Sequence, residues 1–136
     1  LDNAIEHLEL MVEKNPQSAF DWNNLGFVYM NRGFLDKAEQ AFRQAIELEP
    51  EYPLPRVYLA SVYAGRGEAD AAEQQLLTAL EYFPKELEAY YRLALIYEYT
   101  NRFDKAIDAF RQIMHIDENY RDTSARLERL EKIAKS

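Results

Sequence analysis

A step of 34 residues recurs along this sequence and constrains the fold more than any other feature. Three classes of position keep the same residue at that step: Leu25, Leu59 and Leu93; Tyr29, Tyr63 and Tyr97; Ala38, Ala72 and Ala106. A fixed period of this length is typical of stacked arrays built from one supersecondary unit. One such unit cannot bury its apolar face alone, so about three stacked units are needed for a stable core.

The most complete copy of the repeated motif lies in 19–52. It contains, in order, Trp22, Leu25, Gly26, Tyr29, Ala38, Phe42, Ala45 and a closing Pro50. The pattern is therefore W-x2-L-G-x2-Y, then A-x3-F-x2-A and Pro. It resembles the tetratricopeptide repeat, and the resemblance covers nearly the whole chain. The resemblance implies an all-α fold, a right-handed superhelical array of antiparallel helix hairpins (an α-solenoid) in a single domain.

Punctuating residues divide the chain at the same step. Asn15-Pro16 ends the first predicted helix, because proline cannot continue a helix and favours extended geometry before it. The predicted division is a half repeat at 1–18, full repeats at 19–52, 53–86 and 87–120, and a capping helix at 121–136. Because the sequence opens at Leu1 part-way through a repeat, we expect a fragment of a longer protein.

Each full repeat is predicted to form two helices joined by a tight turn. Ser18 is the predicted N-cap of the first of them, because its hydroxyl can accept a hydrogen bond from a free first-turn amide. Gly33 and Gly67 stand at the turns, where glycine adopts the left-handed conformation without steric penalty. Asn101 replaces glycine in the third repeat, and asparagine is the non-glycine residue that best tolerates this conformation.

Composition and charge exclude several classes of partner. The formal net charge is −8, whereas nucleic acid and anionic membranes attract basic surfaces. No run of 18 apolar residues is present, so we predict no direct membrane insertion. Cysteine is absent, which excludes disulfides but leaves the compartment undecided. The segment 121–136 carries a charge of +2, which we interpret as the polar outer face of a solubilising end helix.

No group of residues in the sequence matches a catalytic or cofactor site. The two histidines, His7 and His115, lie at opposite ends of the predicted array. A zinc site needs several His or Cys ligands at short spacing, and His115 beside Asp117 and Glu118 is more typical of a surface cluster. We therefore predict that the chain is not an enzyme and that it holds no cofactor and no metal.

The resemblance implies that the first helix of each repeat lines a concave groove. In the family, the contacts come from the second, fifth, sixth, ninth, twelfth and thirteenth positions of the repeat. In this sequence those positions are Phe20, Asn23, Asn24, Phe27, Met30 and Asn31; Leu54, Val57, Tyr58, Ser61, Ala64 and Gly65; and Glu88, Tyr91, Arg92, Leu95, Glu98 and Tyr99. They predict an apolar, aromatic groove that binds a protein or peptide partner, a helix or extended segment with hydrophobic anchors.

One branch of the family binds chaperone tails through a carboxylate clamp, in which basic and amide side chains hold the C-terminus of a peptide. The matching positions here are Asn23, Phe27, Tyr58, Glu88 and Arg92. Only Arg92 has the required chemistry, because Phe27 is apolar and Glu88 would repel a carboxylate. We therefore predict that there is no clamp of the chaperone-binding type.

Two other functions stay open at this stage. The predicted helix at 1–14 has Ile5, Leu8 and Val12 on one face, and the helix that would normally cover part of this face is not in the sequence. The first alternative is a structural segment of a longer superhelix, or self-association through the open N-terminal helix face. The second is a regulatory domain of a larger protein.

Overall fold

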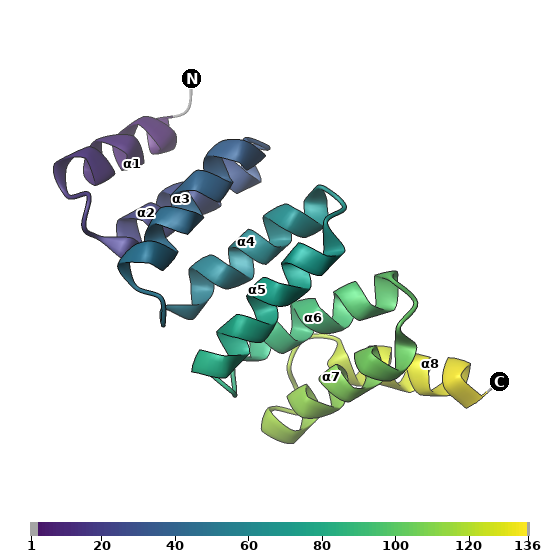
Figure 1. The fold of residues 1–136 in the computed structure, drawn as a ribbon. Helices are drawn as coiled ribbons and strands as arrows, with labels where there is room; N and C mark the ends of the chain where they lie inside the picture. The colour runs from purple at the N-terminus through teal and green to yellow at the C-terminus, as the bar shows by residue number, and fades with distance from the viewer. Residues whose placement is uncertain (1–2, 136) are drawn as a thin grey trace.

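The chain folds into a row of helix hairpins. The computed structural model describes residues 3–135, and the helices there are α1 (Asn3–Lys14), α2 (Ala19–Asn31), α3 (Leu35–Leu48), α4 (Pro53–Gly65), α5 (Ala69–Tyr82), α6 (Leu87–Tyr99), α7 (Phe103–Ile116) and α8 (Thr123–Lys135). Residues 1–2 and 136, which the predicted first and last helices include, lie outside the described part. Figure 1 shows the helices following one another in chain order, with α1 and α8 at opposite ends of the row. Across residues 3–135, every helix is too short or too polar to cross a membrane.

The three complete hairpins are α2–α3, α4–α5 and α6–α7, and they lie within 19–52, 53–86 and 87–120 respectively. Ser18 caps α2, and its hydroxyl accepts a hydrogen bond from the backbone N–H of Asp21 at 3.2 Å. Gly33 and Gly67 have φ angles of 84° and 81°, and Asn101 has a φ angle of 63°. All three turns therefore use the left-handed residue that the sequence predicts.

Helices α2 and α3 approach closely because Gly26 has no side chain. A Cβ atom at Gly26 would lie 2.7 Å from Cε1 of Phe42, which is nearer than carbon atoms approach one another. Phe42 and its counterparts Leu76 and Phe110 are completely buried. Burial of an apolar side chain of this size contributes about 1.5–3 kcal/mol to folding, so this line of residues makes a large contribution to stability along the row.

The repeated tyrosines join each hairpin to the helix before it. Their hydroxyls donate to carboxylates on that helix: Tyr29 to Glu9, Tyr63 to Glu39 and Tyr97 to Glu73. Burial and the hydrogen bond to Glu73 raise the pKa of Tyr97 to about 12, so the hydroxyl keeps its proton at neutral pH. These tyrosines therefore serve the packing between hairpins.

One face of α1 is incompletely covered. Leu8 and Met11 are only partly buried, whereas their counterparts in α3, Phe42 and Ala45, are completely buried. The difference arises because α3 packs on both α2 and α4, while α1, over its described residues, packs mainly on α2.

At the other end of the row, α8 packs on α7. Leu130 of α8 is completely buried, but Ile133, which the sequence places on the same apolar face, is 46% exposed. Ile133 lies about 60° around the helix from Leu130, as Leu127 does on the other side, but only Leu127 is partly buried. The buried part of α8 therefore ends near Leu130, and the following turn, which contains Ile133 and Ala134, is exposed.

Candidate interaction face

Helices α2, α4 and α6 carry the repeat positions that the sequence predicts to line a groove. We name the surface to which these positions belong the α2–α4–α6 face. Its aromatic side chains are the most prominent feature. Phe20 is 63% exposed, Phe27 is 39% exposed and Tyr99 is 88% exposed. Other exposed apolar side chains are spread over the remaining helices and turns. The three on this face give it apolar area that another molecule can cover.

A hollow lies between α4 and α6 on this face. One part, of about 180 Å³, is lined by Ala60, Ser61, Ala64, Arg92, Leu95 and Ile96. A second part, of about 350 Å³, is lined by Ala64, Gly67, Ala69, Leu95, Ile96 and Tyr99. The two parts share three residues and are therefore continuous. The hollow exists because α4 has the small side chains of Ser61 and Ala64 where α2 has Phe27 and Met30.

Phe27 is held in place by aromatic neighbours. Its ring centroid lies 5.1 Å from that of Tyr58 on the next hairpin, and Tyr58 lies 5.8 Å from the buried ring of Phe42. A ring fixed in this way loses little further freedom on binding, which lowers the entropic cost of a contact with a partner.

Three of the residues expected to line a groove are buried. Asn23 is 3% exposed, Val57 is 0% exposed and Tyr91 is 7% exposed. They occupy the same position of the repeat, the fifth, and lie in the packing between consecutive hairpins. Tyr91 also donates its hydroxyl proton to Asp122 Oδ1 at 2.5 Å. These side chains support the face from beneath and do not present themselves to a partner.

The other expected residues lie at or near the surface. Phe20, Phe27, Asn31, Ala64, Gly65 and Tyr99 are exposed, and Asn24, Met30, Leu54, Tyr58, Ser61, Glu88, Arg92, Leu95 and Glu98 are partly buried. Apart from the fifth position of each repeat, every expected side chain is therefore at least partly exposed.

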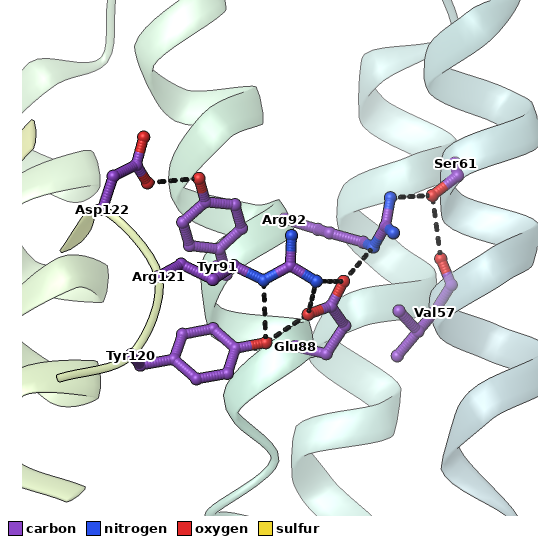
Figure 2. Close-up of polar contacts among 8 residues, drawn as sticks. All are labelled: Val57, Ser61, Glu88, Tyr91, Arg92, Tyr120, Arg121 and Asp122. Atoms are coloured by element: carbon purple, nitrogen blue, oxygen red, sulfur yellow. Dashed lines mark hydrogen bonds and ion pairs between the residues drawn. The ribbon is translucent and has the colours of Figure 1, made fainter. Parts of the chain in front are cut away.

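A polar cluster lies at the α6 part of the face, as Figure 2 shows. Glu88 accepts hydrogen bonds from Arg92 Nε at 3.0 Å and from Arg121 Nη2 at 2.9 Å. The hydroxyl of Tyr120 also donates to Glu88. Arg92 Nη1 donates to Ser61 Oγ at 2.6 Å, which links α6 to α4. Two guanidinium groups therefore compensate the charge of Glu88.

A second cluster joins α6 to α8. Glu98 pairs with Arg129 at 2.6 Å and with Arg126 at 3.4 Å, and Arg126 also pairs with Asp122 at 2.8 Å. Sequence reasoning missed this cluster because it treated 121–136 as a cap. The repeat itself contains the signal, because a further step of 34 from Arg92 and Leu95 reaches Arg126 and Arg129.

The pKa shifts in these clusters follow from burial and pairing. Burial, and then the hydrogen bond to Asp122, raises the pKa of Tyr91. Burial, and then the hydrogen bond to Glu88, raises the pKa of Tyr120. The hydrogen bond from Tyr91, followed by that from Arg126, lowers the pKa of Asp122. At neutral pH both tyrosines are therefore neutral donors and Asp122 is an anion, which makes the clusters suited to charge recognition.

Metal-binding groups do not assemble on this face. Over residues 3–135, no three His, Cys, Asp or Glu side chains are grouped so that they could hold a metal ion. His7 and His115 are both exposed, on α1 and α7, and do not belong to the face. The surface of the α2–α4–α6 face consists of apolar area beside paired charges.

Two family models match the chain. Residues 3–106 match the model of the cilia and flagella-associated protein 70 middle TPR-like domain, and residues 89–124 match the model of the tetratricopeptide repeat. No curated protein sequence matches the chain.

Several solved structures resemble the chain over most of its length. The first TPR of Spaghetti (RPAP3), bound to the HSP90 peptide SRMEEVD, has a TM-score of 0.82 at 18% identity and covers 88% of this chain and 95% of its own. MamA has a TM-score of 0.85 at 21% identity, with 96% and 77% covered. A thermophilic TPR protein of Thermus thermophilus has a TM-score of 0.82 at 23% identity, with 93% and 71% covered. Similarity at these identities shows the fold alone.

Proposed function

The chain belongs to the tetratricopeptide repeat family, and we propose that it binds a protein or peptide partner on its α2–α4–α6 face through apolar anchors. Members of this family are typically non-enzymatic protein-interaction modules. The proposal therefore starts from a scaffold for protein partners. The observation that carries the proposal is the hollow between α4 and α6, which lies on the same face as exposed aromatic rings.

The size and lining of the hollow suit an apolar side chain of the partner. Its lining is mostly alanine, leucine and isoleucine, with Tyr99 at one end and Arg92 at the other. Burying one leucine or phenylalanine side chain there contributes about 1.5–3 kcal/mol. Phe27 on the neighbouring hairpin adds a rigid aromatic surface, and such surfaces are common among the residues that dominate binding energy.

We also propose that a free C-terminal carboxylate is not what this face recognises. Phe27 presents an apolar ring that packs on Tyr58, and an apolar ring cannot hold an anion. The residues at the clamp positions of α2 and α4, which are Asn23, Phe27 and Tyr58, carry no positive charge. The peptide SRMEEVD is bound to the RPAP3 domain, which is 18% identical to the present chain.

Replacing Leu95 with Asp tests the proposal. We expect at least about a thirtyfold loss of affinity, because truncating a residue at the centre of an interface costs about 2 kcal/mol or more. The probes are peptides selected on the whole chain from a random library, and fluorescence anisotropy measures their affinity. Circular dichroism should show unchanged helix content, since Leu95 is only partly buried.

The matched control is Leu77→Asp. Leu77 lies on α5, away from the α2–α4–α6 face, and is 37% exposed, so its replacement should leave peptide affinity unchanged. Equal binding by the Leu95→Asp variant and the parent chain would show that the hollow is not the docking site.

A second candidate function is self-association through α1. The observation that favours it is the incomplete cover of Leu8 and Met11, whose counterparts in α3 are completely buried. Two copies that bring these faces together would complete the burial that a preceding helix provides elsewhere in the row.

Sedimentation velocity over a wide concentration range checks this candidate. If α1 is an assembly surface, the chain should form a dimer at high concentration, and Leu8→Asp should return it to a monomer. Leu10→Asp should leave the dimer intact, because Leu10 lies about 200° around the helix from Leu8 and is 53% exposed. A parent chain that is monomeric throughout the range excludes the candidate.

A further inference from the structure

The charged residues of the α2–α4–α6 face are concentrated at its C-terminal end. The positions expected to line a groove on α2 and α4 are all neutral, and those on α6 include Glu88, Arg92 and Glu98. A further step of 34 residues reaches 122–133, which contains Asp122, Arg126, Arg129 and Lys132. Glu128 and Glu131 lie in the same range. With Arg121, five basic side chains therefore stand against five acidic ones, which makes this end of the face neutral on a chain whose net charge is −8.

Helix α8 continues the face by one more helix. Ala64 of α4 and Leu95 of α6 both line the hollow. The residues one repeat later, Glu98 and Arg129, form the ion pair of 2.6 Å between α6 and α8. The space between α4 and α6 is therefore an apolar hollow, whereas the corresponding place between α6 and α8 holds a charged cluster.

Two of the guanidinium groups are more exposed than the carboxylates with which they pair. The side chains of Glu88 and Glu98 are 15% and 22% exposed. Arg121 and Arg129, which pair with them, are 51% and 56% exposed. An approaching molecule therefore meets these two guanidinium groups before it meets Glu88 or Glu98, whereas Asp122, which is 51% exposed, is itself accessible beside Arg126.

These arginines have donors to spare. Each carboxylate lies between two guanidinium groups: Glu88 between Arg92 and Arg121, and Glu98 between Arg126 and Arg129. A guanidinium carries five N–H donors in a fixed fork, and the Arg129 pair with Glu98 uses Nη2. A second carboxylate can therefore bind Arg121 or Arg129 through charge-assisted hydrogen bonds while the existing pairs stay in place.

We propose that the partner segment is acidic: it places one bulky apolar side chain in the hollow between α4 and α6 and pairs side-chain carboxylates with Arg121 and Arg129. The inference rests on the proposed function of the same face and adds the chemistry of the partner. Packed helices lie about 10 Å apart, and an extended chain covers about 3.3–3.6 Å per residue. The carboxylates of the partner therefore follow or precede the anchor by about three residues.

The test uses the selected library peptides, resynthesised with an amide at the C-terminus so that the only carboxylates are side chains. We expect the selected peptides to contain Asp or Glu about three residues from a bulky apolar residue. The double variant Arg121→Gln/Arg129→Gln should bind them roughly tenfold more weakly, because two exposed charge pairs are lost. Raising the salt concentration from about 0.1 M to about 1 M should weaken binding to the parent chain, because the screening length falls from about 10 Å to about 3 Å.

The matched control is Lys14→Gln/Lys85→Gln, which changes the net charge of the chain equally. Both lysines are exposed and lie outside the α2–α4–α6 face, so this variant should keep the parent affinity. An equal loss in both double variants would attribute the effect to net charge and overturn the pairing with Arg121 and Arg129.

The remaining outcomes separate this inference from the proposed function. If Leu95→Asp abolishes binding and the arginine variant keeps full affinity, the partner is apolar without being acidic, and only the inference fails. If no peptide is selected, or if neither variant changes binding, both fail. If only peptides with a free C-terminus bind, the ligand is the terminal carboxylate and the inference is wrong. A synthetic peptide of residues 1–14 that binds more tightly than the selected peptides would identify a second copy of the chain as the occupant and overturn it as well.

Discussion

The Phe42→Ala variant is expected to lose about 3–5 kcal/mol of unfolding free energy. Phe42 is completely buried, its ring faces the backbone of Gly26, and it lies 5.8 Å from the ring of Tyr58. Removing the ring leaves a cavity that Gly26 has no side chain to fill. Natural domains have only about 5–15 kcal/mol of total stability, so this one change removes a large part of it. Urea denaturation followed by circular dichroism measures the loss.

The control for this prediction is Phe20→Ala, which deletes the same ring from a position that is 63% exposed. Its effect on stability should stay within about 0.5 kcal/mol. A similar loss in both variants would mean that Phe20 contributes to the core as much as Phe42 does, and would contradict the prediction.

The fold could be predicted from the sequence because each packing position recurs at a fixed step. Gly26 is small and Phe42 is large, and the two residues pack against each other. The same combination of a small and a large residue recurs one repeat later as Ala60 and Leu76. A contact encoded several times is recognised even where one copy departs from the pattern. Asn101 is such a departure, and its φ angle of 63° is the one predicted for the glycine that it replaces.

The ion pairs between hairpins could not be predicted in this way. Glu39 pairs with Arg66 at 2.5 Å, and Glu73, one repeat later, pairs with Arg102 at 3.0 Å. The two arginines are 36 residues apart and so do not occupy the same repeat position. A long guanidinium side chain can reach one carboxylate from several backbone positions. The step of 34 residues therefore repeats the carboxylate of each pair but not the arginine.

The candidate site was predicted in part for a related reason. Phe27 and Tyr99 were expected on the face and are exposed there, whereas Val57 and Tyr91 were expected and are buried. The fifth position of the repeat points between consecutive hairpins in this chain, and burial of that kind depends on how closely neighbouring hairpins pack. The charges of α8 were missed for another reason, because the last helix was interpreted only as a cap.

The Leu130→Asp variant is expected to detach α8 from the row. Leu130 is completely buried, and an aspartate in its place would have to be buried as an unpaired charge. The expected cost is more than about 4 kcal/mol, which is exceptional for a single substitution. In a row of repeats each unit contacts only its neighbours, so the loss should act mainly on α8 and α7. Hydrogen exchange should show lost amide protection in α8, reduced protection in α7 and retained protection in α2–α5.

The matched control is Ile133→Asp on the same helix. Ile133 is 46% exposed, so a carboxylate there can stay in water and α8 should keep its protection. If Leu130→Asp instead lowers protection equally in α2 and α3, the row unfolds as one cooperative unit and its ends are not independent. If α8 detaches alone, Arg126 and Arg129 leave the face while the hollow between α4 and α6 stays intact. The same variant then separates the apolar part of partner binding from the charged part.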